Sequence, residues 1–181
     1  MLYFTADAHL GHDNIRRLDG RPFSDVDEME RAYIEVWNTT VTSQDTTYHL
    51  GDFFWRNEVA HRVLPQLNGK IICLRGNHDK SWWKPEKLKK FKHVTLATDS
   101  IHVVNHTGTP PLVLCHYPMR SWQGSARGSW HLYGHTHRAL SAYGKSLCVC
   151  WNVQNYSLVS LEQVKEQMNI QPKTEDPYGH I

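Results

Sequence analysis

Five short apolar runs in this chain each end in polar side chains of types that bind metal ions, and this recurrence constrains the fold most. The polar clusters are Asp7 with His9, Gly51-Asp52, Gly76-Asn77-His78-Asp79, His116, and Gly134-His135-Thr136-His137. Short runs rich in β-forming residues predict buried strands. In α/β sheets, ligands bind outside the carboxyl ends of strands, where loops can position side chains without breaking the ladder. We therefore expect a sheet whose strand ends build one site.

Strand and helix signals alternate along the chain. Strands are predicted at 2–6, 46–50, 71–74, 111–115 and 131–133, and alternating residues at 101–104 and 147–159 indicate further strands. Helices are predicted at about 25–38, 57–67 and 160–170. Ser24 to Asp27 resembles a capping box for the first helix, and Ser160 with Gln163 forms one for the last. The alternation predicts an α/β fold.

The length of 181 residues fits one domain spanning residues 1–181, with a loosely packed tail at about 171–181 that contains Pro172 and Pro177. No segment approaches the ~20 apolar residues that a membrane span requires. The amino terminus has no basic start and no long apolar run, so we expect no signal peptide and a soluble, cytoplasmic protein.

Composition restricts the binding partners. A net charge of +2 requires no polyanionic partner. The four cysteines lie in apolar stretches, which suits reduced, buried thiols. Cys148 and Cys150 are separated by one residue and have no partner pair, which argues against a cysteine-type zinc site. The 13 histidines are more informative, because histidine is the commonest metal ligand.

The order of the motifs carries more weight than any single motif. Asp7 and His9 lie two residues apart, so in an extended segment both side chains point to one side. His135 and His137 repeat this spacing with two imidazoles. Taken alone, D-x-H and G-D also fit ordinary surface turns. Together with G-N-H-D and a strand-end histidine, they predict a shared metal site.

In this order the motifs resemble those of the calcineurin-like metallophosphoesterase superfamily, D-x-H, G-D, G-N-H-[DE], H and G-H-x-H. The resemblance spans Phe4 to His137. It is similar to the short single-domain bacterial and phage members in the segment Asp7 to Ile15 and in His116-Tyr-Pro118. The implied fold is a four-layer α/β/β/α sandwich, with two mixed β-sheets flanked by helices.

The resemblance implies a dinuclear metal centre with seven ligands. These are Asp7, His9 and His137 for one ion, Asn77, His116 and His135 for the other, and Asp52 as the bridge. The set contains no thiolate, which suits Mn²⁺, Fe, Zn²⁺, Mg²⁺ or Ni²⁺ rather than a structural zinc. Manganese is our first choice.

The implied activity is a metal-dependent hydrolase, a phosphodiesterase or phosphatase acting on small, nucleotide-like phosphoesters by in-line attack of a hydroxide that bridges the metals. Asp52 and His78 would be the catalytic residues, with His78 protonating the leaving group or donating a hydrogen bond to the phosphate. His12, Arg56, Asn77 and His78 would contact the substrate, Arg56 as a phosphate clamp.

One position departs from the family pattern. Many members continue G-D-x-x-D-R-G, where the second Asp orients the equivalent of His78, but this chain has Trp55 there. Another group or solvent must then set the protonation state of His78. Arg56 also fits a solvated cation at a helix start, and His49, inside a strand, is predicted to be structural.

Two aromatic and basic segments are candidates for substrate recognition. Residues 80–92 carry six lysines with Trp82, Trp83 and Phe91, which could stack a nucleobase or could simply anchor a solvated helix edge. Trp122 and Trp130, with nearby arginines, form the second segment.

Two other functions compete with a hydrolase of small substrates. A nuclease on single-stranded nucleic acid is not favoured, because the net charge is low. A catalytically inactive protein-binding scaffold, as in the retromer complex, predicts damaged ligands, whereas all seven positions here hold Asp, Asn or His.

Overall fold

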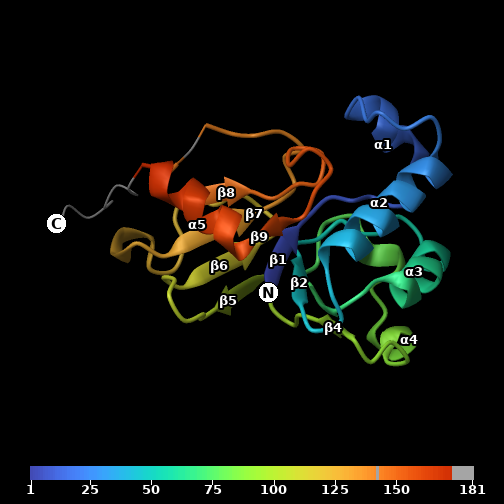
Figure 1. Ribbon diagram of the computed structural model, residues 1–181, viewed down its shortest axis with the longest axis horizontal. Coiled ribbons are helices and arrows are strands. Elements are labelled where there is room, and N and C mark those ends of the chain that lie inside the picture. Colours follow the sequence, from blue (N-terminus) through green and yellow to red (C-terminus); the bar gives the residue numbers. More distant parts are fainter. Residues whose placement is uncertain (142, 173–181) are drawn as a thin grey trace.

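Two mixed β-sheets pack face to face in the computed structural model, which describes residues 1–141 and 143–172 (Figure 1). The first sheet has the order β4 (Val94–Leu96), β3 (Lys70–Cys73), β2 (Thr46–His49), β1 (Leu2–Thr5) and β9 (Val159–Ser160). The second has the order β5 (Ile101–Val104), β6 (Leu112–Cys115), β7 (Trp130–Tyr133) and β8 (Ser146–Cys148). In each sheet one edge strand, β9 or β5, is antiparallel to its neighbour and the others are parallel.

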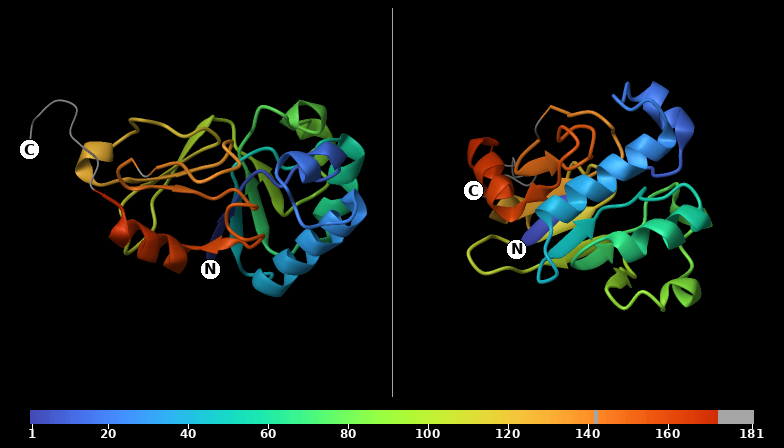
Figure 2. Two further views of the ribbon diagram at one scale, coloured as in Figure 1. Left: turned by 90° about the horizontal axis from the view of Figure 1, so that it is seen from above. Right: turned by 45° about the vertical axis from the view of Figure 1, so that its right-hand side comes forward.

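Helices flank the sheets. They are α1 (Asp13–Leu18), α2 (Val26–Thr40), α3 (Asn57–Val63), α4 (Pro85–Leu88) and α5 (Leu161–Ile170), with short 3₁₀ helices η1 (Leu64–Gln66), η2 (Asp79–Ser81) and η3 (Ser125–Arg127). Figures 1 and 2 show α1 to α4 grouped beside the first sheet, while α5 packs along β8 and β9. The expected fold of two mixed sheets flanked by helices is confirmed.

Two helices differ at their ends from the sequence prediction. The α2 helix is capped by Asp25, whose carboxylate accepts the backbone N–H of Glu28 at 2.7 Å, and Ser24 instead donates to the Glu28 carboxylate. The capping signal is therefore shifted by one residue. In the helix predicted at 57–67, only α3 is α-helical, and the chain continues as the 3₁₀ helix η1. The change occurs because Pro65 has no N–H for the α-helical hydrogen bonds. The capping box of Ser160 and Gln163 is confirmed.

The apolar core lies on both faces of the first sheet. One cluster fills the space under α2 and α3 with buried Tyr33, Trp37, Phe53 and Trp151. The other lies between the two sheets and includes Phe4, Leu50, Leu114 and Leu132. Side chains from adjacent positions of a strand thus enter opposite clusters, as Tyr3 and Phe4 do.

The carboxyl ends of the parallel strands meet at one edge of the molecule, where an isolated β-bridge between Ala6 and Cys150 joins the two sheets. Every polar cluster predicted from the sequence follows one of these strand ends. Among the described residues, no helix is long and apolar enough to cross a membrane. Most of the tail predicted at 171–181 lies outside the described residues.

Candidate metal centre

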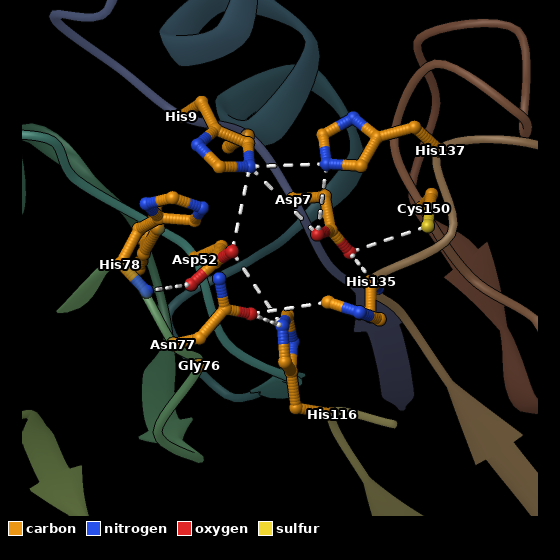
Figure 3. A network of polar contacts seen from close by, with 12 residues as sticks. Asp7, His9, Asp52, Gly76, Asn77, His78, His116, His135, His137 and Cys150 are labelled. Atoms are coloured by element: carbon orange, nitrogen blue, oxygen red, sulfur yellow. Dashed lines mark hydrogen bonds and ion pairs between the residues drawn. The ribbon is translucent and has the colours of Figure 1, made fainter. Parts of the chain in front are cut away.

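Loops from both sheets bring the predicted ligands together (Figure 3). Asp7 and His9 follow β1, Asp52 follows β2, Asn77 and His78 follow β3, His116 follows β6, and His135 and His137 follow β7. Asp7, His9, Asp52 and His116 are almost completely buried. Side-chain donor atoms of Asp7, His9 and His137, and likewise of Asp7, Asp52 and His116, lie close enough together to hold a metal ion.

The backbone of these loops is strained. Seven described residues other than glycine have a positive φ, and five of them are predicted ligands: Asp7 (57°), His9 (49°), Asp52 (55°), His135 (71°) and His137 (52°). The left-handed conformation costs a residue with a side chain about 1–2 kcal/mol. Such strain persists where the surroundings enforce it, and it clusters at functional sites.

Two glycines let the backbone approach the buried carboxylates. A Cβ atom at Gly76 would collide with Oδ1 of Asp52, and one at Gly134 would collide with Oδ2 of Asp7. The Gly residues of G-N-H-D and G-H-T-H are thus required by close packing against the two carboxylates.

The first half of the cluster surrounds Asp7. Its Oδ1 lies 3.3 Å from Nε2 of His137 and 3.8 Å from Nε2 of His9. The Nε2 atoms of His9 and His137 are 3.2 Å apart. Oδ1 of Asp7 is buried and has no hydrogen-bond partner within the described part of the chain. Its other oxygen accepts the backbone N–H of His135 at 2.8 Å.

The second half is built around Asp52 and Asn77. Oδ2 of Asp52 lies 3.6 Å from Nε2 of His9 and 3.5 Å from Nε2 of His116, so this carboxylate stands between the two halves. Oδ1 of Asn77 lies 2.9 Å from Nε2 of His116 and 3.0 Å from Nδ1 of His135.

Hydrogen bonds at Nδ1 of His137 and of His116 fix which ring nitrogen of each faces the cluster. Nδ1 of His137 lies 2.7 Å from the Asp19 carboxylate, and Nδ1 of His116 lies 2.9 Å from the Leu50 carbonyl. Both oxygens are acceptors, so each Nδ1 carries a hydrogen and each Nε2 directs a lone pair inward. These lone pairs meet those of Asp7 and Asp52, and such a gathering of acceptors needs positive charge between them. The residues therefore fit divalent cations.

When no cation is bound, protonation of His137 supplies part of this positive charge. Burial by itself would lower the pKa of His137, but the carboxylates of Asp19 and Asp7 outweigh it and raise the pKa to about 9. Burial by itself would raise the pKa of Asp7, but the nearby imidazoles of His137 and His9 lower it overall. A cation would displace the proton of His137.

A buried aspartate braces two of the ligand loops. Oδ2 of Asp79 accepts the backbone N–H groups of Asp52 at 2.8 Å and Gly76 at 2.7 Å. Oδ1 accepts the N–H of Phe53 at 3.0 Å and Nε1 of Trp82 at 2.6 Å. Asp79 ends the G-N-H-D motif directly after the two predicted site residues Asn77 and His78, and this position was a signal for its role.

A second brace involves Arg21, which is buried. Its guanidinium donates to the carbonyls of Asp7 at 2.9 Å and Ala8 at 2.7 Å, and it also pairs with Asp19. Arg21 and Asp19 therefore tie the loop after β1 to His137. No sequence pattern singled out these two residues.

Trp55 takes the place expected for an aspartate and contacts two predicted substrate residues. Its ring centroid lies 3.9 Å from that of His12 and 5.4 Å from that of His78. His12 caps α1, with Nδ1 accepting the N–H of Ile15 at 3.1 Å. The backbone N–H of His78 donates to Oδ1 of Asp52 at 2.8 Å, and its ring lies 5.5 Å from that of His9.

Arg56 follows Trp55 in the chain. It is the exposed N-cap residue of α3, and among the described residues its side chain makes no hydrogen bond or ion pair with the predicted ligands.

His49 fits the structural role predicted for it. It is fully buried, its ring stacks on Phe53 with centroids 3.7 Å apart, and burial lowers its pKa to about 3.

The aromatic rings of the two candidate recognition segments lie mostly in the core, so the first segment fits the predicted hydrophobic anchor and not a stacking surface for a nucleobase. Trp82 is fully buried, and Phe91, Trp122 and Trp130 are each no more than 9% exposed. These side chains are anchors in the core: Trp82 and Phe91 belong to the first cluster and Trp130 to the second, and Trp122 packs beside His131. Trp83 is half-buried and packs against the first core cluster.

The fold and the site define an α/β protein of two mixed sheets with a buried carboxylate and imidazole cluster at the strand ends. The chain is 34% identical over 173 residues to the uncharacterized protein MJ1445 of Methanocaldococcus jannaschii, covering 90% of this chain and 88% of that protein. It belongs to the same family as MJ1445. No family model matches the sequence.

One solved structure shows the same fold. The protein of unknown function AQ665 from Aquifex aeolicus superposes with a TM-score of 0.70 at 23% identity, covering 92% of this chain and 98% of that one. The Pseudomonas putida nuclease MPE gives a TM-score of 0.49 at 18% identity, covering 79% and 63% of the two chains. An archaeal phosphodiesterase gives 0.49 at 21%, covering 82% and 81%. A TM-score of 0.49 is too low to carry an inference about activity.

Proposed function

We propose that this protein is a dinuclear metal-dependent phosphoesterase of the calcineurin-like metallophosphoesterase superfamily. One observation carries the proposal: lone pairs of carboxylates and imidazoles from four loops converge around Asp7 and Asp52. Residues held at strained φ angles at this point support a functional rather than a structural role. This mixed set of oxygen and imidazole donors suits several divalent ions, and we take Mn²⁺ as the first candidate.

The residues divide between two cation sites on either side of Asp52. Asp7, His9 and His137 would hold one ion, Asn77, His116 and His135 the other, and Asp52 both. When bound, the two cations would supply Lewis-acid stabilisation of the phosphoryl oxygens and a water of lowered pKa. Asp19, the Leu50 carbonyl and Asp79 would keep the ligands in this arrangement, as outer partners of metal ligands do.

His78 is the residue of this chain best placed to handle a proton. Its backbone N–H is engaged by Asp52, while its ring stands beside His9 and Trp55. The imidazole would give a proton to the leaving oxygen or donate a hydrogen bond to the phosphate. Trp55 would hold the ring by contact instead of by a carboxylate hydrogen bond, and with His12 it would form one wall of the substrate site.

The test is hydrolysis by Mn²⁺-loaded protein of an aryl phosphomonoester and an aryl phosphodiester, followed by cyclic nucleotides, dinucleotides and single strands. We expect metal-dependent cleavage of small esters. Asp52→Asn should abolish activity with the fold retained, and Asp99→Asn, at an exposed position, is the matched control. Full activity in Asp52→Asn would overturn the two-metal mechanism. Failure to cleave either aryl ester would favour the inactive scaffold.

A further inference from the structure

A pair of cysteines lies directly behind Asp7. Sγ of Cys148 is 3.3 Å from Sγ of Cys150, and both residues are free and buried. The Cys150 thiol donates a hydrogen bond to Oδ2 of Asp7 at 3.2 Å (Figure 3). This contact links the dithiol to the carboxylate at the centre of the candidate site, and the proposed mechanism does not use it.

The backbone presents the two thiols to each other. Cys148 ends β8, and Cys150 lies two residues on, in the bridge to Ala6. Residues at i and i+2 of an extended strand share a face, with their Cα atoms about 6.6 Å apart. Disulfides span Cα separations of roughly 4.4–6.8 Å. A bond here would lie near the upper limit, so it would be strained and easily reduced.

Small oxidants can reach the pair through a cavity. Cys148 lines a cavity of about 230 Å³ together with Tyr133, Leu140 and Gln154. Leu140 is 42% exposed, so this cavity extends to the surface. Cys148 donates its hydrogen to the sulfur of Cys150, and Cys150 donates its own to Asp7. Cys148 is therefore the cysteine of the pair that lines the cavity and that an oxidant meets first.

We propose that Cys148 and Cys150 form a reversible disulfide that weakens metal binding through Asp7. The Cys148 sulfur attacks one oxygen of hydrogen peroxide and breaks the O–O bond, giving a sulfenic acid, and the other oxygen leaves as water with the Cys148 proton. The Cys150 sulfur then attacks the Cys148 sulfur and displaces the oxygen of the sulfenic acid, which leaves as water with the Cys150 proton. In total, two thiols lose two electrons and two protons, and the peroxide becomes two waters.

The disulfide has no S–H, so Oδ2 of Asp7 would lose one of its two hydrogen bonds and keep the one from His135. Closing the bond would also shift Cys150, which pairs with Ala6 next to Asp7. Loss of an outer partner of a metal ligand typically lowers metal affinity about 10- to 100-fold. This effect rests on the proposed metal centre, whereas disulfide formation does not.

The experiment treats the reduced full chain with hydrogen peroxide and follows two readouts. Intact mass and thiol alkylation should show the loss of about two hydrogens and two thiols, restored by dithiothreitol. Cys148→Ser and Cys150→Ser should each prevent this loss, the second with a hydroxyl that still donates to Asp7. Cys115→Ser, at a buried cysteine elsewhere, should behave as the unaltered chain.

The second readout is Mn²⁺ binding by equilibrium dialysis. Oxidised protein should bind at least about tenfold more weakly than reduced protein, and peroxide should not change the affinity of Cys148→Ser. Retention of both thiols in the folded, peroxide-treated chain would overturn the disulfide. A disulfide with unchanged affinity would overturn its coupling to the metals. If reduced protein binds no Mn²⁺, the proposed function and the coupling both fail, and the mass still decides the disulfide.

Discussion

Replacing Asp79 by asparagine tests whether this buried carboxylate holds the loops after β2 and β3. The side chain is fully buried and accepts four N–H groups, two on each oxygen. An asparagine amide has one oxygen and one NH₂ group. Whichever way it turns, two N–H donors lose their acceptor and face another donor. The two orientations leave either Asp52 and Gly76 or Phe53 and Trp82 unpaired.

The cost follows from these two orphaned donors. Each buried, unsatisfied donor costs about 1–3 kcal/mol. Burial raises the pKa of Asp79, so part of the cost is offset because a buried charge is removed. We therefore expect a loss of about 3 kcal/mol in the free energy of unfolding, which for a chain of 181 residues lowers Tm by about 9 °C.

Urea unfolding of the metal-free protein measures this loss without interference from metal binding. Asp99→Asn makes the same chemical change at an exposed position and should stay within about 0.5 kcal/mol of the unaltered chain. If Asp79→Asn changed the free energy of unfolding as little as Asp99→Asn, the four hydrogen bonds would not support the loops.

The remaining predictions concern the metals and the proton carrier. His78→Ala should lower kcat while bound Mn²⁺ measured by metal analysis stays the same; a parallel loss of metal would assign His78 to the metal centre. Asp19→Asn should weaken Mn²⁺ binding about 10- to 100-fold in equilibrium dialysis, since Nδ1 of His137 loses its carboxylate partner, and unchanged affinity would refute this. Because a cation must displace the His137 proton, Mn²⁺ affinity should rise about tenfold per pH unit below the pKa of about 9 and level off above it. The raised pKa also stabilises the metal-free fold fully below about pH 6.5, and this contribution of up to about 3 kcal/mol is lost as pH rises through 9, visible as a falling Tm. A flat pH profile of both quantities would contradict the protonation of His137.

The strand ends were predictable because each short apolar run stops where a polar motif begins. The spacing of Asp7 with His9 and of His135 with His137 was equally visible in the sequence. Parallel pairing of β1 with β2 and of β6 with β7 aligns the strand ends within each sheet, and the bridge between Ala6 and Cys150 joins the two sheets. Local sequence patterns encode neither.

The supporting contacts could not be predicted, since they join residues distant in the sequence. Asp19 and His137 are 118 residues apart, and Cys150 and Asp7 are 143 apart. The role of the aromatic segments was ambiguous for a different reason. A basic segment with tryptophans predicts equally well an exposed lip or a buried anchor, and only the packed structure shows Trp82 donating to Asp79 in the core.

The central claim is that two cations share Asp52, and the most direct test is the metal content and EPR spectrum of the Mn²⁺-loaded protein. We predict two Mn²⁺ per chain with the spectrum of a spin-coupled pair, and loss of that coupling in Asp52→Asn. A single Mn²⁺ per chain, or two ions with uncoupled spectra in the unaltered protein, would contradict the account.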